Sequence, residues 1–152
     1  MRTTLLGYLL IAPCLFADGG ANCTKVGGAI LTNFINETTT LGSASGDLKG
    51  ALGVSVLSVT PGPNGSTVFH NQHQWVTEAG DTIFLAPANA TAYPIPAAPG
   101  LFSAVYSSGA QITGGTGRFA GASGSLAVFG ALNLTLGQVV LRYSGQVCFA
   151  AQ

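Results

Sequence analysis

The sequence predicts an all-β fold, a closed antiparallel β-barrel of about eight strands. Apolar, β-branched and aromatic residues alternate with polar ones over short segments, and Gly- or Pro-rich breaks separate these segments. Sustained helical periodicity is missing from residues 22–152. Consecutive antiparallel strands either expose two sheet edges or close on themselves, and closure removes both edges.

Length and composition restrict the class of protein further. The chain has 152 residues, 47% of them hydrophobic, which is enough for one domain with its own core and too apolar for a disordered chain. Five Lys and Arg residues balance five Asp and Glu residues. Because no basic surface can form to neutralise phosphates, a nucleic-acid partner is not expected.

The first residues have the pattern of an export signal. Arg2 is followed by a mostly apolar stretch over 5–17, which is too short to span a bilayer. Small residues at Gly19 and Ala21 favour cleavage after Ala21, with cleavage after Ala17 as the alternative. We therefore expect a signal peptide over 1–21, a single barrel domain over 22–152, no integral membrane span, and a secreted protein, either extracellular or periplasmic.

Cysteine usage agrees with export. Removal of the signal peptide takes away Cys14 and leaves Cys23 and Cys148, near the two ends of the mature chain. In an oxidising compartment this pair predicts a disulfide that joins the ends. Neither cysteine belongs to a CxxC motif, and Cys and His do not occur at zinc-like spacing. No metal site and no cofactor are expected.

The strands can be placed from the alternation and the breaks. In the last of them Val139, Leu141 and Tyr143 share an apolar face, while Val140 and Arg142 lie on the other. Turn residues at 61–65, 78–81 and 94–100 separate the earlier strands. The predicted strands cover residues 28–35, 47–59, 67–77, 82–85 with a continuation to 93, 101–112, 125–134 and 138–148.

A polar cluster from His70 to Asp81 is the first candidate site. His70 and His73 are three residues apart, so a strand places them on opposite faces and they cannot bind one metal together. His73 and Trp75 share a face. If that face points inward, His73 is a candidate acid/base or ligand donor beside an indole wall. If it points outward, both are ordinary cross-strand partners.

The segment 112–125 carries the most distinctive motif, Gly114-Gly115-Thr116-Gly117-Arg118-Phe119. A strand follows it rather than a helix, which argues against a phosphate-binding loop. The segment resembles the GGTGRF-type connection of the allene oxide cyclase-like and dirigent-like barrel family. The resemblance extends more loosely over 47–148 and is closest to small exported members.

This resemblance implies an eight-stranded barrel with a hydrophobic cavity, often assembled into oligomers. Enzymes of the family cyclise an unsaturated fatty epoxide, and dirigent members steer the coupling of phenoxy radicals. The family's cavity residues cannot be matched to positions in this sequence, so catalytic residues stay unassigned. Phe119 is expected to plug one barrel end. Arg118 is expected to pair with a carboxylate or to cap backbone carbonyls, with contact to a ligand as the alternative. Tyr106 and Tyr143 either pack or offer a phenol to the cavity.

We expect an exported barrel that binds or shelters a small apolar ligand. The first alternative is a cyclase or isomerase that confines a lipophilic substrate and polarises it with His73, Arg118 or a cavity tyrosine. The second is a structural surface protein without a ligand. Charged residues are few, so the solvated surface must consist mainly of neutral polar side chains. Because such a surface resists association less well than a charged one, we also expect a homo-oligomer in which a second subunit covers one outer face.

Overall fold

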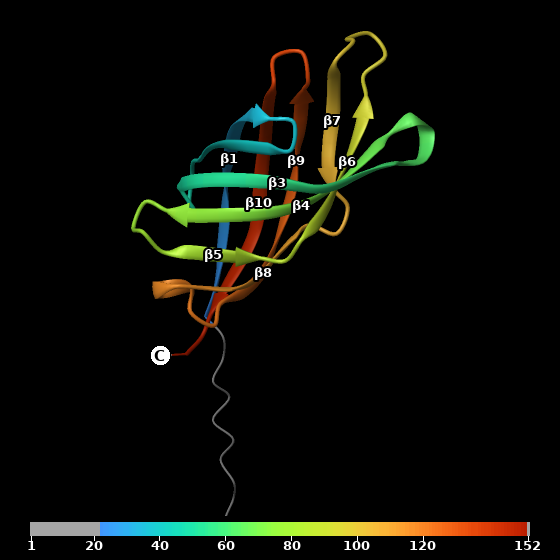
Figure 1. The fold of residues 1–152 in the computed structure, drawn as a ribbon. Coiled ribbons are helices and arrows are strands. Elements are labelled where there is room, and N and C mark those ends of the chain that lie inside the picture. The colour runs from blue at the N-terminus through green and yellow to red at the C-terminus, as the bar shows by residue number, and fades with distance from the viewer. Residues whose placement is uncertain (1–21, 152) are drawn as a thin grey trace, which may run out of the picture.

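β-Strands make up most of residues 22–151, the part of the chain that the computed structural model describes (Figure 1). The predicted signal peptide lies outside these residues. Within 22–151, no helix has the length and apolar character needed to cross a membrane. The elements in chain order are β1 (Asn22–Asn36), β2 (Thr39–Ala44), β3 (Gly50–Pro61), η1 (Pro63–Gly65), β4 (Thr67–Thr77), β5 (Thr82–Leu85), β6 (Ala88–Pro94), β7 (Leu101–Tyr106), β8 (Ala110–Gly115), η2 (Gly117–Phe119), β9 (Ser123–Asn133) and β10 (Gln138–Phe149).

All strand pairs are antiparallel, and they close into a barrel. The order β10-β1-β2-β3-β4-β5-β8-β9-β7-β6 is completed by the pairs β10–β9 and β4–β6. β5 and β6 pair with two different parts of β4. In the same way, β8 and β7 pair with two different parts of β9. Each of these pairs therefore fills one position, and the barrel has eight positions. The predicted fold class is confirmed.

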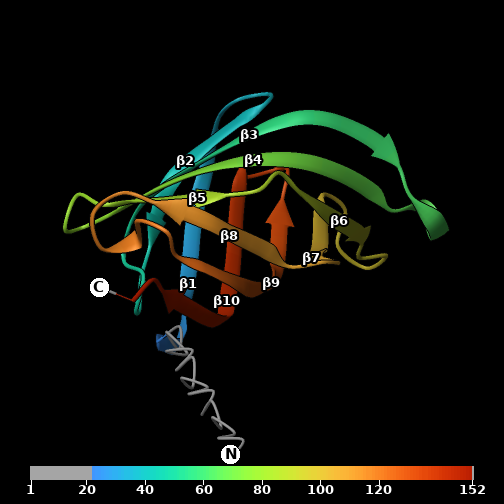
Figure 2. The same ribbon diagram turned by 90° about the horizontal axis from the view of Figure 1, so that it is seen from below.

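Two walls face each other across the interior. β3 and β4 arch over one side, and β1, β10 and β9 form the other (Figure 2). Alternation along each strand sends one set of side chains inward, as the burial of Leu141 and Tyr143 and the exposure of Val140 and Arg142 on β10 show. The predicted faces of this strand are confirmed. The core is therefore the inside of the barrel.

Phe119 closes one end of the barrel. Its side chain is fully buried, and its ring centroid lies 5.6 Å from that of Phe149. The short helix η2 holds Phe119 in place through the bond from the Phe119 amide to the Thr116 carbonyl. The expected plug is thus found where the glycine-rich segment turns back toward β9.

The disulfide between Cys23 and Cys148 is also confirmed. The two residues are directly opposite in the β1–β10 register and 125 positions apart in the sequence. Asn22 pairs with Phe149 beside them, so the two ends of the described chain lie together below the barrel (Figure 1).

Candidate functional site

An apolar cavity of about 70 Å³ remains inside the barrel. Within residues 22–151, no Lys, Arg, Asp or Glu lines it. Every barrel position contributes to the wall, which makes the cavity the centre of the barrel rather than a surface cleft. The lining side chains are those of Ile30, Thr32, Phe34, Thr40, Leu52, Val54, Val56, Phe69, Asn71, His73, Trp75, Leu85, Ala90, Ala92, Ala104, Tyr106, Ala110, Val128, Leu132, Val139 and Leu141.

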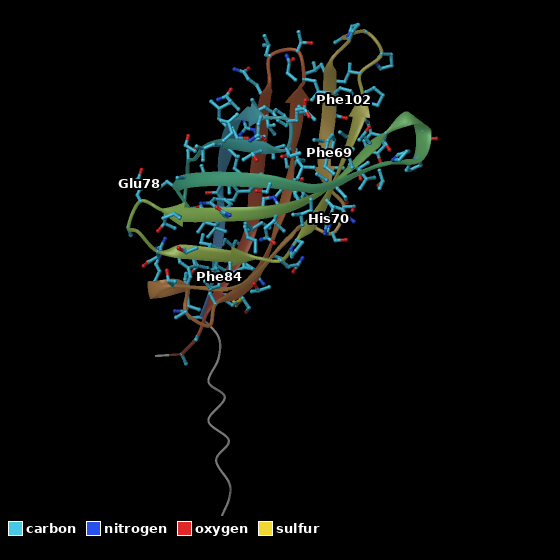
Figure 3. The ribbon with its side chains drawn as sticks, viewed as in Figure 1. Phe69, His70, Glu78, Phe84 and Phe102 are labelled. Atoms are coloured by element: carbon cyan, nitrogen blue, oxygen red, sulfur yellow. A yellow bond between two sulfur atoms is a disulfide. The ribbon has the colours of Figure 1, made fainter. Side chains whose placement is uncertain are left out.

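β4 brings the polar part of the lining into the cavity. Asn71, His73 and Trp75 are two residues apart and therefore point to the same side of the strand, inward. His70 lies on the opposite side, where its Nδ1 is 2.8 Å from Asn89 Oδ1 on β6 (Figure 3). The prediction that the two histidines lie on opposite faces is confirmed.

Asn71, His73 and Tyr106 form a hydrogen-bonded cluster in this mostly apolar wall. His73 Nε2 lies 2.9 Å from the Tyr106 hydroxyl, and Asn71 Nδ2 donates to the same oxygen over 3.3 Å. All three side chains are buried, with exposed fractions of 6% for Asn71, 8% for His73 and 7% for Tyr106. Tyr106 reaches the cluster from the end of β7, across the barrel strand β6.

Burial keeps the cluster uncharged at neutral pH. Desolvation lowers the pKa of His73 to about 4, and no opposing charge offsets this effect. Desolvation also raises the pKa of Tyr106 to about 12, although the Asn71 hydrogen bond works in the other direction. The cavity therefore contains hydrogen-bonding groups without a net charge.

Two atoms of the cluster have no hydrogen-bond partner. Among residues 22–151, Asn71 Oδ1 and His73 Nδ1 are the buried side-chain atoms left unpaired. An unpaired buried polar atom costs about 1–3 kcal/mol, so such atoms in a native structure call for an explanation. Both belong to residues that line the cavity.

Trp75 and Tyr143 pack next to each other, but only Trp75 lines the cavity. The rings meet edge to face at 5.2 Å, and Trp75 Nε1 donates to the Leu48 carbonyl over 2.8 Å. The Tyr143 hydroxyl donates to the Ser45 carbonyl and accepts from the Leu48 amide. Tyr143 therefore fastens the segment between β2 and β3 to the barrel wall.

Arg118 lies on the outside of the barrel. Its guanidinium carbon is 4.7 Å from the centre of the Phe119 ring, and its Nε is 4.0 Å from Asp81 Oδ2 in the β4–β5 turn. The side chain is half-exposed. This places Arg118 beside a carboxylate, one of its expected positions, and away from the cavity.

Sequence reasoning brought His73, Trp75 and Tyr106 forward and missed Asn71. The sequence did indicate Asn71, because it lies two residues before His73, just as His73 lies two residues before Trp75, and so it shares their face of β4. Phe34 was also missed. It lines both the cavity and a shallow hollow between the β1–β2 and β9–β10 turns, and so it lies between the two.

A scan against protein-family models finds no match for this chain, and a search of curated proteins finds none either. Three chains of solved structures match it. One is a pterocarpan synthase dirigent protein, with 16% sequence identity, a TM-score of 0.35, and coverage of 95% of this chain and 98% of the other. The resemblance to dirigent-like and allene oxide cyclase-like proteins therefore stays a prediction, and the site has to be interpreted from its own residues.

Proposed function

We propose that the barrel binds a small apolar molecule in its interior cavity. The supporting observation is that an apolar cavity with unpaired polar atoms persists in an otherwise packed core. Protein interiors are close-packed, so a space of about 70 Å³ at the centre of the barrel is a departure from ordinary core packing. A protein that serves only as a scaffold gains nothing from that space, whereas a binding protein needs it.

The size of the cavity limits the ligand. Pockets for drug-sized ligands measure roughly 300–1,000 Å³. A cavity of about 70 Å³ calls for a smaller molecule, such as a short aliphatic chain. Phe34 stands between the cavity and the outer hollow, so we propose entry at this end, opposite the Phe119 plug.

Filling the cavity tests the proposal. Ala104 lines the cavity from β7, and we expect Ala104→Phe to abolish retention of lipophilic compounds. Ala127 is exposed on β9, so Ala127→Phe is the matched control. Each purified protein is incubated with a lipophilic extract, and the retained compounds are identified by mass spectrometry, with circular dichroism as a check on folding. Equal retention by the wild-type protein and a folded Ala104→Phe variant would contradict binding in the cavity.

A cyclase or isomerase is the second candidate, because a hydrogen-bonded histidine and tyrosine in an apolar cavity can polarise a substrate oxygen. The test is turnover of an unsaturated fatty epoxide by the purified protein. Turnover that disappears in a folded His73→Ala variant would favour the enzyme over simple binding.

We also propose that residues 1–21 are removed on export. The Cys23–Cys148 disulfide is compatible with an oxidising compartment. Amino-terminal sequencing of the secreted protein should begin at Asn22, or at Asp18 if the alternative site is used.

A homo-oligomer remains a prediction, and the outer face of the barrel offers a surface for it. Leu31 is opposite Val140 in the β1–β10 register, and Phe129 is opposite Val105 across β9 and β7. All four side chains are about half-exposed. Sedimentation of the mature protein would show whether a second copy covers this face.

A further inference from the structure

We propose that Asn71, His73 and Tyr106 recognise one uncharged hydroxyl group, so that the cavity selects apolar alcohols over hydrocarbons, ethers and carboxylates. This inference rests on the proposed binding function and specifies the class of ligand. It starts from the two unpaired atoms, Asn71 Oδ1 and His73 Nδ1, which belong to residues of a mostly apolar cavity wall.

The hydrogen bonds within the cluster fix what the unpaired atoms can do. An amide nitrogen only donates, so the Tyr106 oxygen accepts from Asn71 Nδ2. The Tyr106 hydrogen is then available to His73 Nε2, and the imidazole carries its own hydrogen on Nδ1. In this arrangement Asn71 Nδ2, the Tyr106 hydroxyl and His73 Nε2 all have partners. What is left over is one acceptor, Asn71 Oδ1, and one donor, His73 Nδ1.

The alternative orientation of the Asn71 amide gives the same requirement. If the amide oxygen faces Tyr106, the phenol donates to it and accepts from His73 Nε2. The leftover groups are then a donor on Asn71 and an acceptor on His73. In both orientations a ligand has to supply one donor and one acceptor, which a single hydroxyl group does.

The two side chains lie next to each other in the cavity wall. They stand two residues apart on the same face of β4. Both also bond the same Tyr106 oxygen, at 2.9 and 3.3 Å. The tyrosine thereby aligns the asparagine and the histidine side by side in the wall.

Charge excludes a carboxylate. Within residues 22–151 no cationic side chain lines the cavity, and burial lowers the pKa of His73 to about 4, so the imidazole is neutral. A buried carboxylate would therefore have no opposite charge, which is strongly unfavourable. The remaining lining, including Ile30, Leu52 and Phe69, matches an aliphatic body.

A series of probes of similar length tests the preference. 1-Hexanol supplies a donor and an acceptor, methyl pentyl ether supplies an acceptor alone, n-heptane supplies neither, and hexanoate is charged. Trp75 is the single tryptophan of the chain and lines the cavity, so its fluorescence reports binding. We expect 1-hexanol to bind about tenfold more tightly than the ether or heptane, because a buried polar atom left without a partner weakens binding. Hexanoate should not bind, because its charge would be buried without an opposite charge.

Matched variants tie the preference to the cluster. Asn71→Leu and His73→Leu should each bring the affinity for 1-hexanol close to that for heptane. His70→Leu, which changes the histidine on the opposite face of β4, should leave the preference intact.

The outcomes separate the two proposals. Equal binding of 1-hexanol and heptane by the wild-type protein would overturn hydroxyl recognition and leave apolar binding standing. Binding of none of the probes would overturn both. A preference for 1-hexanol that survives in folded Asn71→Leu and His73→Leu proteins would show that other groups select the ligand.

Discussion

At the scale of single residues, the buried imidazole of His73 predicts how stability depends on pH. In the unfolded chain a histidine titrates near pH 6.5, whereas burial lowers the pKa of His73 in the folded protein to about 4. Between these values the unfolded state binds the extra proton, so the free energy of unfolding falls as the pH falls from about 6.5 to 4. The expected loss is on the order of 3 kcal/mol, measured by urea unfolding at a series of pH values.

The variants from the binding experiment serve here as well. His73→Leu should flatten this pH dependence, because the titrating group is gone, while His70→Leu should keep it. A His73→Leu protein with the pH dependence of the wild type would mean that another group causes the loss.

Part of the cluster could be predicted from the sequence. A spacing of two residues on a strand is enough to put His73 and Trp75 on one face, and Asn71 extends the same pattern. That Tyr106 bonds His73 could not be predicted, because the two residues are 33 positions apart and meet only once the barrel closes. The position of Tyr143 outside the cavity could not be predicted either. Its hydroxyl bonds to the segment between β2 and β3, and no local sequence pattern indicates that contact.

At the scale of elements, close contact between the start of β1 and the β2–β3 connection depends on a glycine. A methyl group at Gly28 would overlap the Ser45 carbonyl oxygen and the Tyr143 hydroxyl. Gly28→Ala should therefore destabilise the protein by about 1–3 kcal/mol, as overpacking does. Thermal or urea unfolding would measure the loss.

The neighbouring glycine provides the control. A methyl group at Gly27 would come no nearer than 3.4 Å to the Tyr143 carbonyl oxygen, an ordinary contact. Gly27→Ala should accordingly have a much smaller effect. If the two variants lose the same stability, close approach at Gly28 does not explain the glycine.

β2 shows why the prediction of strands was incomplete. In Thr39–Ala44 the inward positions are Thr40, Gly42 and Ala44, and the one large apolar side chain, Leu41, is half-exposed. Such a strand lacks the apolar alternation on which prediction depends.

β1 likewise begins at Asn22, ahead of the predicted residue 28, because its first residues are ordered by pairing with β10. The strand predicted over 101–112 is divided by a turn in which the Gly109 amide bonds the Tyr106 carbonyl.

At the scale of the whole molecule, the disulfide between Cys23 and Cys148 closes a loop of nearly the entire barrel. In the loop-entropy model, a separation of 125 residues corresponds to about 5 kcal/mol of stabilisation. The double variant Cys23→Ala, Cys148→Ala should lose stability of this order in urea unfolding. A loss well under 1 kcal/mol would show that the pairing of β1 with β10 holds the ends together without the bond.

Closure of the barrel was predictable because consecutive antiparallel strands either expose two sheet edges or close on themselves, and closure removes both edges. The two barrel positions that are divided between β5 and β6 and between β7 and β8 were not predicted as such, since they depend on register with β4 and β9. The cavity itself is a property of how side chains from all strands fill the interior, and no local pattern encodes its volume.

The most direct measurement of binding inside the barrel is a crystal structure of the mature protein with 6-bromohexan-1-ol. The bromine would give an anomalous peak among the apolar side chains near Leu52 and Phe69, with the hydroxyl oxygen within hydrogen-bond distance of Asn71 and His73. Bromine found only on the outer surface, with the interior unoccupied at saturating probe, would contradict a ligand-binding barrel.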